Sequence, residues 1–168
     1  MRILAFIGML AVVVGVAAGA FFFGGFFNVS ATWDDPAPVV SALTRVRMAS
    51  IARRAKDAPT VPLDDAAIIK EGARNYAKYG CANCHGAPGV QWSKFSEGLN
   101  PGPPDLSEIA KERSPAAIFW VVKNGIRMTG MPSFGKAGAP DNEVWQIAAF
   151  VKKLPNTSEA DYKSWTAP

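Results

Sequence analysis

The stretch "YGCANCHGAP", residues 79–88, decides how the rest of this chain is interpreted. Cys81 and Cys84 are separated by two residues, and His85 follows directly. They are the only two cysteines and the only histidine in the chain. Three kinds of site contain such a group: a zinc site, a redox-active dithiol and a haem attachment site.

The number of candidate ligands disfavours zinc. A structural zinc site takes four ligands, usually cysteine or histidine, and this chain offers three. A carboxylate as the fourth ligand stays open, but the adjacent Cys84 and His85 are poorly placed to close one tetrahedron. A thioredoxin-like dithiol is expected in a βαβ unit, and the chain shows no convincing alternating strand pattern.

The spacing Cys-X-X-Cys-His is typical of covalent haem attachment. The two cysteines then bond the vinyl groups of haem, and the histidine ligates the iron. The motif follows a predicted helix, whose end directs His85 toward a porphyrin face. We therefore predict one covalently bound haem c. Attachment of this type implies the compartment outside the cytoplasmic membrane.

The second iron ligand has to come from elsewhere, and methionine is the common alternative to a second histidine. The segment "NGIRMTGMPSFG", residues 124–135, contains Met128 and Met131. Met131 precedes Pro132, which favours an extended backbone at the methionine. Flanking glycines, the first of them Gly130, permit a close approach to a flat ring. We predict that Met131 is the ligand; Met128, or a methionine that only fills a core gap, is the alternative.

The domain around these motifs is predicted to be all-α. Four helices are expected, at about 64–79, from 107, at 115–124 and at 141–154. Their capping signals are Asp64 or Asp65, Ser114 followed by Pro115, and Asp141. Apolar periodicity predicts the buried faces: Ile68, Ile69, Gly72 and Tyr76 on the first of them, and Val144, Ile147, Ala148 and Val151 on the last.

An apolar segment, residues 3–27, precedes this domain and contains no charged residue. As a helix of ~1.5 Å per residue it is about 37 Å long, more than the ~30 Å of a bilayer core. Ala18-Gly19-Ala20 resembles a cleavage site, so a signal peptide is the alternative. The apolar run continues past that site through five phenylalanines. We predict an uncleaved anchor, residues 1–33, that contacts the lipid bilayer through residues 3–27.

Residues 34–62 are predicted to form a basic juxtamembrane helix, about 38–57, and a stiff linker that contains proline. The helix has an apolar stripe in its first half: Val39, Val40, Leu43 and Val46. It is interpreted either as lying on anionic lipid or a partner, or as a solvated spacer. The haem domain is then residues 63–168. The chain's net charge of +4 is too small to indicate nucleic acid, and the oligomeric state stays unknown.

From about residue 64 to residue 154 the chain resembles a class I cytochrome c of the single-haem, membrane-anchored bacterial type. The motifs that carry this resemblance are residues 81–85, Gly130-Met131-Pro132 and the final helix "VWQIAAFVKKL". The resemblance implies four or five helices around one haem. It also implies a crossing of the first and last helices, at positions matched here by Gly72, Tyr76 and Phe150.

The resemblance departs from the mitochondrial pattern at one point. Tyr76 lies five residues before Cys81 instead of four, so Gly80 is interpreted as an inserted turn residue. The family also uses a proline carbonyl to orient the ligand histidine. Pro104 is the better match for that role, and Pro103 is the alternative. The candidates for donors to the haem propionates are Arg127, Trp145 and Trp92.

The function implied by the resemblance is transfer of single electrons between redox protein partners in or at the membrane. The chain is then a carrier and not an enzyme, anchored in the bacterial inner membrane by a single pass, with its haem domain in the periplasm. One alternative is a fixed haem subunit of a larger oxidoreductase complex. The other is a haem sensor or peroxidase-like enzyme, which requires a missing or displaceable Met131.

Overall fold

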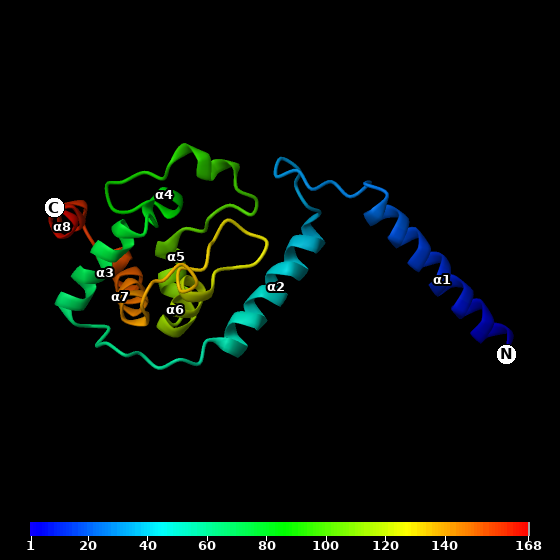
Figure 1. Cartoon of the computed structure of the whole chain (residues 1–168), viewed down its shortest axis with the longest axis horizontal. Coiled ribbons are helices and arrows are strands. Elements are labelled where there is room, and N and C mark those ends of the chain that lie inside the picture. Colours follow the sequence, from blue (N-terminus) through cyan, green and yellow to red (C-terminus); the bar gives the residue numbers. More distant parts are fainter. Residues whose placement is uncertain (168) are drawn as a thin grey trace. The chain divides into compact units, whose positions relative to one another are not determined.

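A computed structural model describes residues 1–167 of the chain (Figure 1). It contains two compact units, Met1–Asp34 and a second unit that begins at Asp35. The described residues form helices and no β-strand; an isolated bridge between Ala87 and Val90 is the sole β-type pairing among them. The all-α prediction is confirmed.

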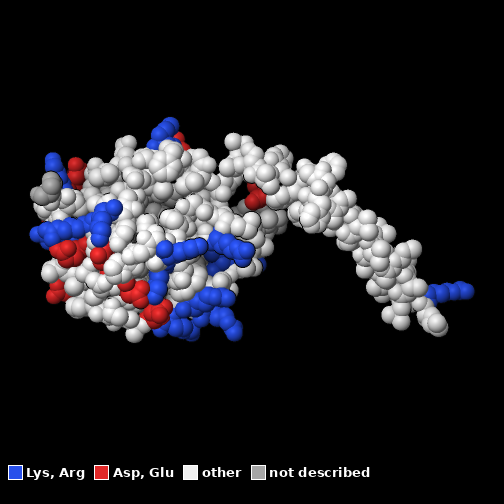
Figure 2. All heavy atoms as spheres, in the orientation of Figure 1, with Lys and Arg blue, Asp and Glu red and all other residues white. Residues whose placement is uncertain are grey.

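The first unit consists of helix α1, Arg2–Phe23, and a short following segment. No residue of α1 is buried, and Figure 2 shows charged atoms only at its N-terminal end. Twenty-two residues at ~1.5 Å each give about 33 Å, so α1 is long and apolar enough to cross a membrane. A membrane anchor and a leader peptide both meet this description, and the choice between them stays a prediction.

The second unit contains the remaining helices. They are α2 (Ala37–Arg54), α3 (Ala66–Lys78), the single turn α4 (Ala82–His85), α5 (Leu106–Glu112), α6 (Pro115–Asn124), α7 (Asp141–Lys153) and α8 (Glu159–Thr166). Two short 3₁₀ turns, Lys94–Gly98 and Leu154–Asn156, complete the secondary structure of the described residues.

Of the three predicted helix caps, two are confirmed and one is shifted by one residue. The Asp65 carboxylate accepts the backbone N–H of Ala67 and of Ile68 at the start of α3. Ser114 caps α6 in the same way through its hydroxyl. Pro140, not Asp141, occupies the capping position of α7. Asp141 therefore lies in the first turn, where its negative charge complements the helix dipole.

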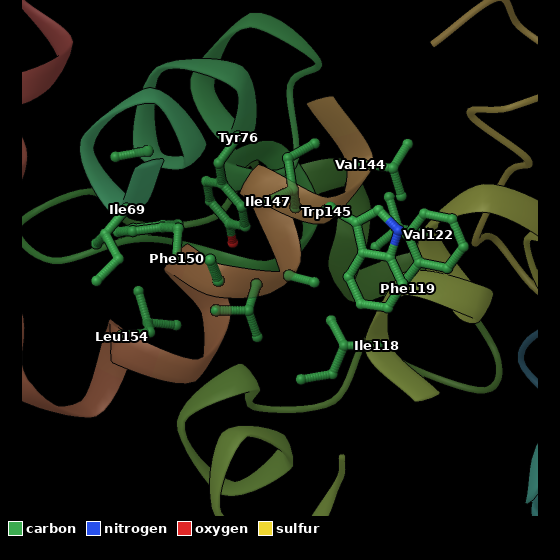
Figure 3. Close-up of a cluster of buried hydrophobic side chains, with 14 of the residues drawn as sticks. Ile69, Tyr76, Ile118, Phe119, Val122, Val144, Trp145, Ile147, Phe150 and Leu154 are labelled. Carbon is green, nitrogen blue, oxygen red and sulfur yellow. The ribbon is translucent and has the colours of Figure 1, made fainter. Parts of the chain in front are cut away.

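The core is organised by the crossing of α3 over α7 (Figure 3). A Cβ atom added to Gly72 would lie 2.0 Å from the carbonyl oxygen of Gln146, so glycine is what lets the two backbones meet. One turn further on, the rings of Tyr76 and Phe150 pack edge to face with centroids 5.3 Å apart. The crossing implied by the resemblance is confirmed at all three positions.

Helix α6 packs against α7 near Trp145, in the first half of that helix. The rings of Phe119 and Trp145 stack with centroids 4.0 Å apart, and both side chains are fully buried. The four residues predicted to form the inner face of α7 are all buried: Val144, Ile147, Ala148 and Val151. This part of the core brings the apolar side of α6 next to the site described below.

Two features of the second unit differ from the expectations. Helix α8 was not predicted, although Ser158 caps it and Tyr162 packs on Phe150 at 5.7 Å. The predicted apolar stripe of α2 is exposed along its length: Val39, Val40, Leu43 and Val46. The buried residue of α2 is Ile51, so the helix presents a different face to the domain.

Candidate functional site

A tight connection between α3 and α4 positions the Cys-X-X-Cys-His motif. Gly80 follows the end of α3 with φ +71°, a left-handed conformation that glycine adopts at low cost. The backbone N–H of Cys81 then donates to the carbonyl oxygen of Tyr76, and that of His85 donates to Cys81. The interpretation of Gly80 as a turn residue is confirmed.

The residues predicted for the site line one cavity of about 590 Å³. This volume is within the range of ~300–1,000 Å³ that is typical of small-molecule and cofactor sites. The lining includes all five predicted residues: Cys81, Cys84, His85, Pro104 and Met131. Its walls come from the inner side of α6, the end of α7 and the loops before α5 and after α6, and they are mostly apolar.

His85 is held in one tautomer. Its Nδ1 atom lies 3.1 Å from the carbonyl oxygen of Pro104. A carbonyl only accepts, so Nδ1 carries the proton and donates, and Nε2 keeps the lone pair that a metal ion takes. Burial lowers the pKa of His85, while the hydrogen bond to Pro104 acts in the opposite direction. This contact distinguishes Pro104 from Pro103.

Of the two candidate methionines, only Met131 lies at the cavity. It is partly buried, lines the cavity and packs on the core. The Met128 side chain is 91% exposed, and its backbone has φ +59°. The location therefore supports Met131 as the second ligand, which stays a proposal.

The loop that carries Met131 is fixed against the end of α6. The N–H of Ile126 donates to the carbonyl oxygen of Met131 (3.1 Å). At Gly125, with φ +68°, an added Cβ would lie 2.6 Å from the carbonyl carbon of Pro132. Gly125 directly follows the predicted helix 115–124, and its role as the contact point for the loop was not predicted.

The two glycines on either side of Met131, Gly130 and Gly135, each lie against another segment of the protein. A Cβ at Gly130 would meet the side chain of Leu99 at 2.9 Å, and one at Gly135 would meet Lys123 at 2.9 Å. Both glycines let protein segments pack closely. The close approach of a flat ring, for which these glycines were expected, stays a prediction.

The environment of the cysteines argues against zinc and against a redox dithiol. Burial raises the pKa of Cys81 to about 12. A thiol that stays protonated is a weak nucleophile in disulfide exchange. Among the described residues, no cluster of three or more histidine, cysteine, aspartate or glutamate side chains could hold a metal ion. Two attachment thiols, a neutral imidazole and a thioether around one apolar cavity fit a covalently attached haem with nitrogen and sulfur ligands.

The three candidates for propionate donors do not line this cavity. Arg127 and Trp92 are exposed, and Trp145 stacks on Phe119. The cations that do line the cavity are Arg47 of α2 and Arg113, which precedes α6. Sequence reasoning missed both. The signal for Arg47 was the spacing of Thr44, Arg47, Met48 and Ile51, which places these residues on one helix face.

Comparison with known proteins agrees with this geometry. The family model described as "Cytochrome C oxidase, cbb3-type, subunit III" matches residues 67–151, half of the chain. The match spans α3 to most of α7 and includes every predicted site residue. No curated protein matches the chain, and no solved structure matches it.

Proposed function

The chain belongs to the cytochrome c family described as cytochrome c oxidase, cbb3-type, subunit III, and from this premise we propose that it is a membrane-anchored, single-haem electron carrier. Membership makes it a class I cytochrome c that binds haem c covalently and transfers electrons. The number of haems, the ligands, the anchor and the side of the membrane are the parts that we propose.

Cys81 and Cys84 would hold the haem through thioether bonds, and His85 and Met131 would be the iron ligands. Haem c supplies an iron that accepts and releases one electron. The Pro104 carbonyl keeps the His85 ring in the orientation and tautomer that present Nε2. The bonds of the loop around Met131 keep the thioether at the cavity. Because the chain itself would supply both of these iron ligands, the site would favour electron transfer over the binding of a substrate.

The observation that carries this proposal is the His85–Pro104 contact at 3.1 Å in a cavity that Met131 also lines. The test is a reductive titration of the purified protein, followed by exposure to carbon monoxide. A one-electron transition and a reduced form that does not bind carbon monoxide support a carrier. Ready binding of carbon monoxide by the wild-type protein favours the sensor or peroxidase-like alternative.

Anchoring through α1 is supported by its length and by its uncovered apolar surface. Haem attachment of this type takes place outside the cytoplasmic membrane, so the N-terminus would stay inside and the haem domain would face the periplasm. Membrane fractions washed with salt and carbonate should retain the protein, and protease added to spheroplasts should digest the haem domain. A soluble protein that begins near Phe21 would show that α1 is a cleaved leader.

A second candidate is a fixed haem subunit within a larger membrane oxidoreductase. The description of the matching family as an oxidase subunit favours it. Purification from gently solubilised membranes separates the two candidates. A free carrier elutes alone, whereas a subunit elutes with the same partner polypeptides in constant proportion.

A further inference from the structure

Helix α2 lies outside the segment that matches the cytochrome family, yet it lines the cavity. Its lining residues are Thr44, Arg47, Met48 and Ile51. They follow the spacing i, i+3, i+4, i+7, which places them on one side of a helix. Ile51 is 6% exposed, so this side is packed against the domain.

The charge of this face distinguishes it from the other walls. Arg47 and Arg113 are the two cationic residues among those that line the cavity, and no aspartate or glutamate lines it. Within residues 1–167 the side chain of Arg47 forms no hydrogen bond or ion pair, whereas Arg54 of the same helix is bonded to Ser50. A partly buried guanidinium at an apolar cavity requires an anion or water to satisfy its donors.

Arg113 belongs to a different part of the cavity lining, the short connection between α5 and α6. It follows α5, and its carbonyl oxygen accepts a hydrogen bond from Nζ of Lys152 at 3.0 Å. Its guanidinium forms an ion pair with the carboxylate of the adjacent Glu112 at 3.4 Å. Figure 1 shows α2 and the α4 turn well separated, with the segments between α4 and α7 lying between them. A haem held by Cys81 and Cys84 would leave its two propionates to be bound by other residues of the cavity lining.

We propose that α2 is part of the haem site and that Arg47, together with Arg113, binds the haem propionates. The inference rests on the proposed function, since it requires haem in the cavity. Two guanidinium groups match two carboxylates in number and charge, and arginine forms bidentate pairs with carboxylates. Helix α2 thus closes the pocket and sets its charge, in addition to connecting the anchor to the domain.

The test uses the full-length protein and three variants, Arg47→Met, Arg47→Lys and Arg45→Met. Arg45 is exposed on the same helix and serves as the matched control. The reduction potential is measured against pH by titration followed in the haem absorbance. A cation beside the haem favours the reduced state, because reduction removes one positive charge from the iron. Arg47→Met should therefore lower the potential.

The pH profile gives a readout that simple packing does not affect. Loss of the cation raises the pKa of the propionate. The fall in potential that accompanies deprotonation should therefore move to higher pH in Arg47→Met. The reduction potential and pH profile of Arg47→Lys should be closer to those of the wild type than those of Arg47→Met are. The potential and profile of Arg45→Met should equal those of the wild type.

Two results would overturn the inference. One is a potential and a pH profile of Arg47→Met that coincide with those of Arg45→Met. The other is the reverse ranking, with Arg47→Met closer to the wild type than Arg47→Lys, because methionine retains the apolar stem and lacks the charge. Failure of the proposed function is separate: it appears as a wild-type protein without covalent haem.

Discussion

The two sides of the pocket are built differently. On one side α3 crosses α7, and the two helices pack closely against each other at Gly72, Tyr76 and Phe150. On the other side the α4 turn, the Met131 loop and α2 face a cavity of about 590 Å³. The first side is complete from protein contacts alone, and the second is shaped for a group that the protein holds. Substitutions on the first side should therefore change mainly the free energy of unfolding. Substitutions on the second side should change mainly the absorption, the reduction potential and the ligand binding of the iron.

The largest effect on the iron is expected from Met131→Ala. Loss of the thioether should abolish the weak near-infrared sulfur-to-iron absorption of the oxidised protein, lower the potential and open the iron to carbon monoxide. The helical circular dichroism spectrum should not change. Met128→Ala is the matched control and should retain the absorption, with a stability change within about 0.5 kcal/mol, because that side chain is exposed. The reverse outcome for the two methionines would exchange their roles.

The largest effect on stability is expected from Gly72→Val. The new side chain would overlap the backbone of Gln146, so α3 and α7 must move apart. We expect a loss of about 3 kcal/mol or more in the free energy of unfolding, at the upper end for overpacked cores. Chemical denaturation measures it. Gly98→Val is the control, since no atom lies within 4 Å of a Cβ there. Equal stability of the two variants would contradict the crossing.

Gly125→Ala should change both the stability of the fold and the absorption of the iron, because Gly125 joins the end of α6 to the Met131 loop. The positive φ angle and the contact with the loop backbone predict a loss of about 1–3 kcal/mol and a weakened near-infrared absorption. Gly138→Ala also has a positive φ angle but no atom within 4 Å, so it isolates the cost of the backbone conformation. If Gly138→Ala weakens the absorption equally, the loop contact is not what positions Met131.

A small effect is expected from Glu143→Gln. Glu143 of α7 pairs with Lys78 at 2.8 Å and accepts the Tyr79 hydroxyl at 2.8 Å. The bond from Lys78, then that from Tyr79, lowers the pKa of Glu143 below its ordinary value of 4.5. The stabilisation is therefore present above about that pH and is lost as pH falls through the lowered value.

Denaturation at neutral and at strongly acidic pH measures this effect. The variant should be slightly less stable than the wild type at neutral pH, and the difference should disappear in acid. A difference that persists in acid would assign the effect to something other than the charge of Glu143.

The helices on the side of the α3–α7 crossing could be predicted from the sequence. Caps at Asp65 and Ser114 and the 3.6-residue apolar period locate α3, α6 and the buried face of α7, because those residues contact other protein. A short motif and the small number of histidines and methionines predicted residues that line one cavity, and their roles as haem ligands stay a proposal.

The face of α2 could not be predicted in the same way. Its cavity-lining residues include Thr44, Arg47 and Met48. A search for apolar residues at helical spacing does not find this face, because it contains polar residues and lines a cavity. The stripe that does show the period, from Val39 to Val46, remains exposed. The role of Gly125 was missed for a similar reason, since its contact lies in a loop whose path the sequence does not indicate.

The measurement that tests the central claim most directly is the mass of the denatured, full-length protein after acid–acetone extraction. Cys81 and Cys84 are the only thiols of the chain and both line the cavity. We predict that the denatured wild-type protein has the mass of the chain plus one haem. When both cysteines are changed to serine, the denatured protein should have the mass of the chain alone. A wild-type protein whose haem extracts freely, or whose mass is that of the chain alone, would contradict it.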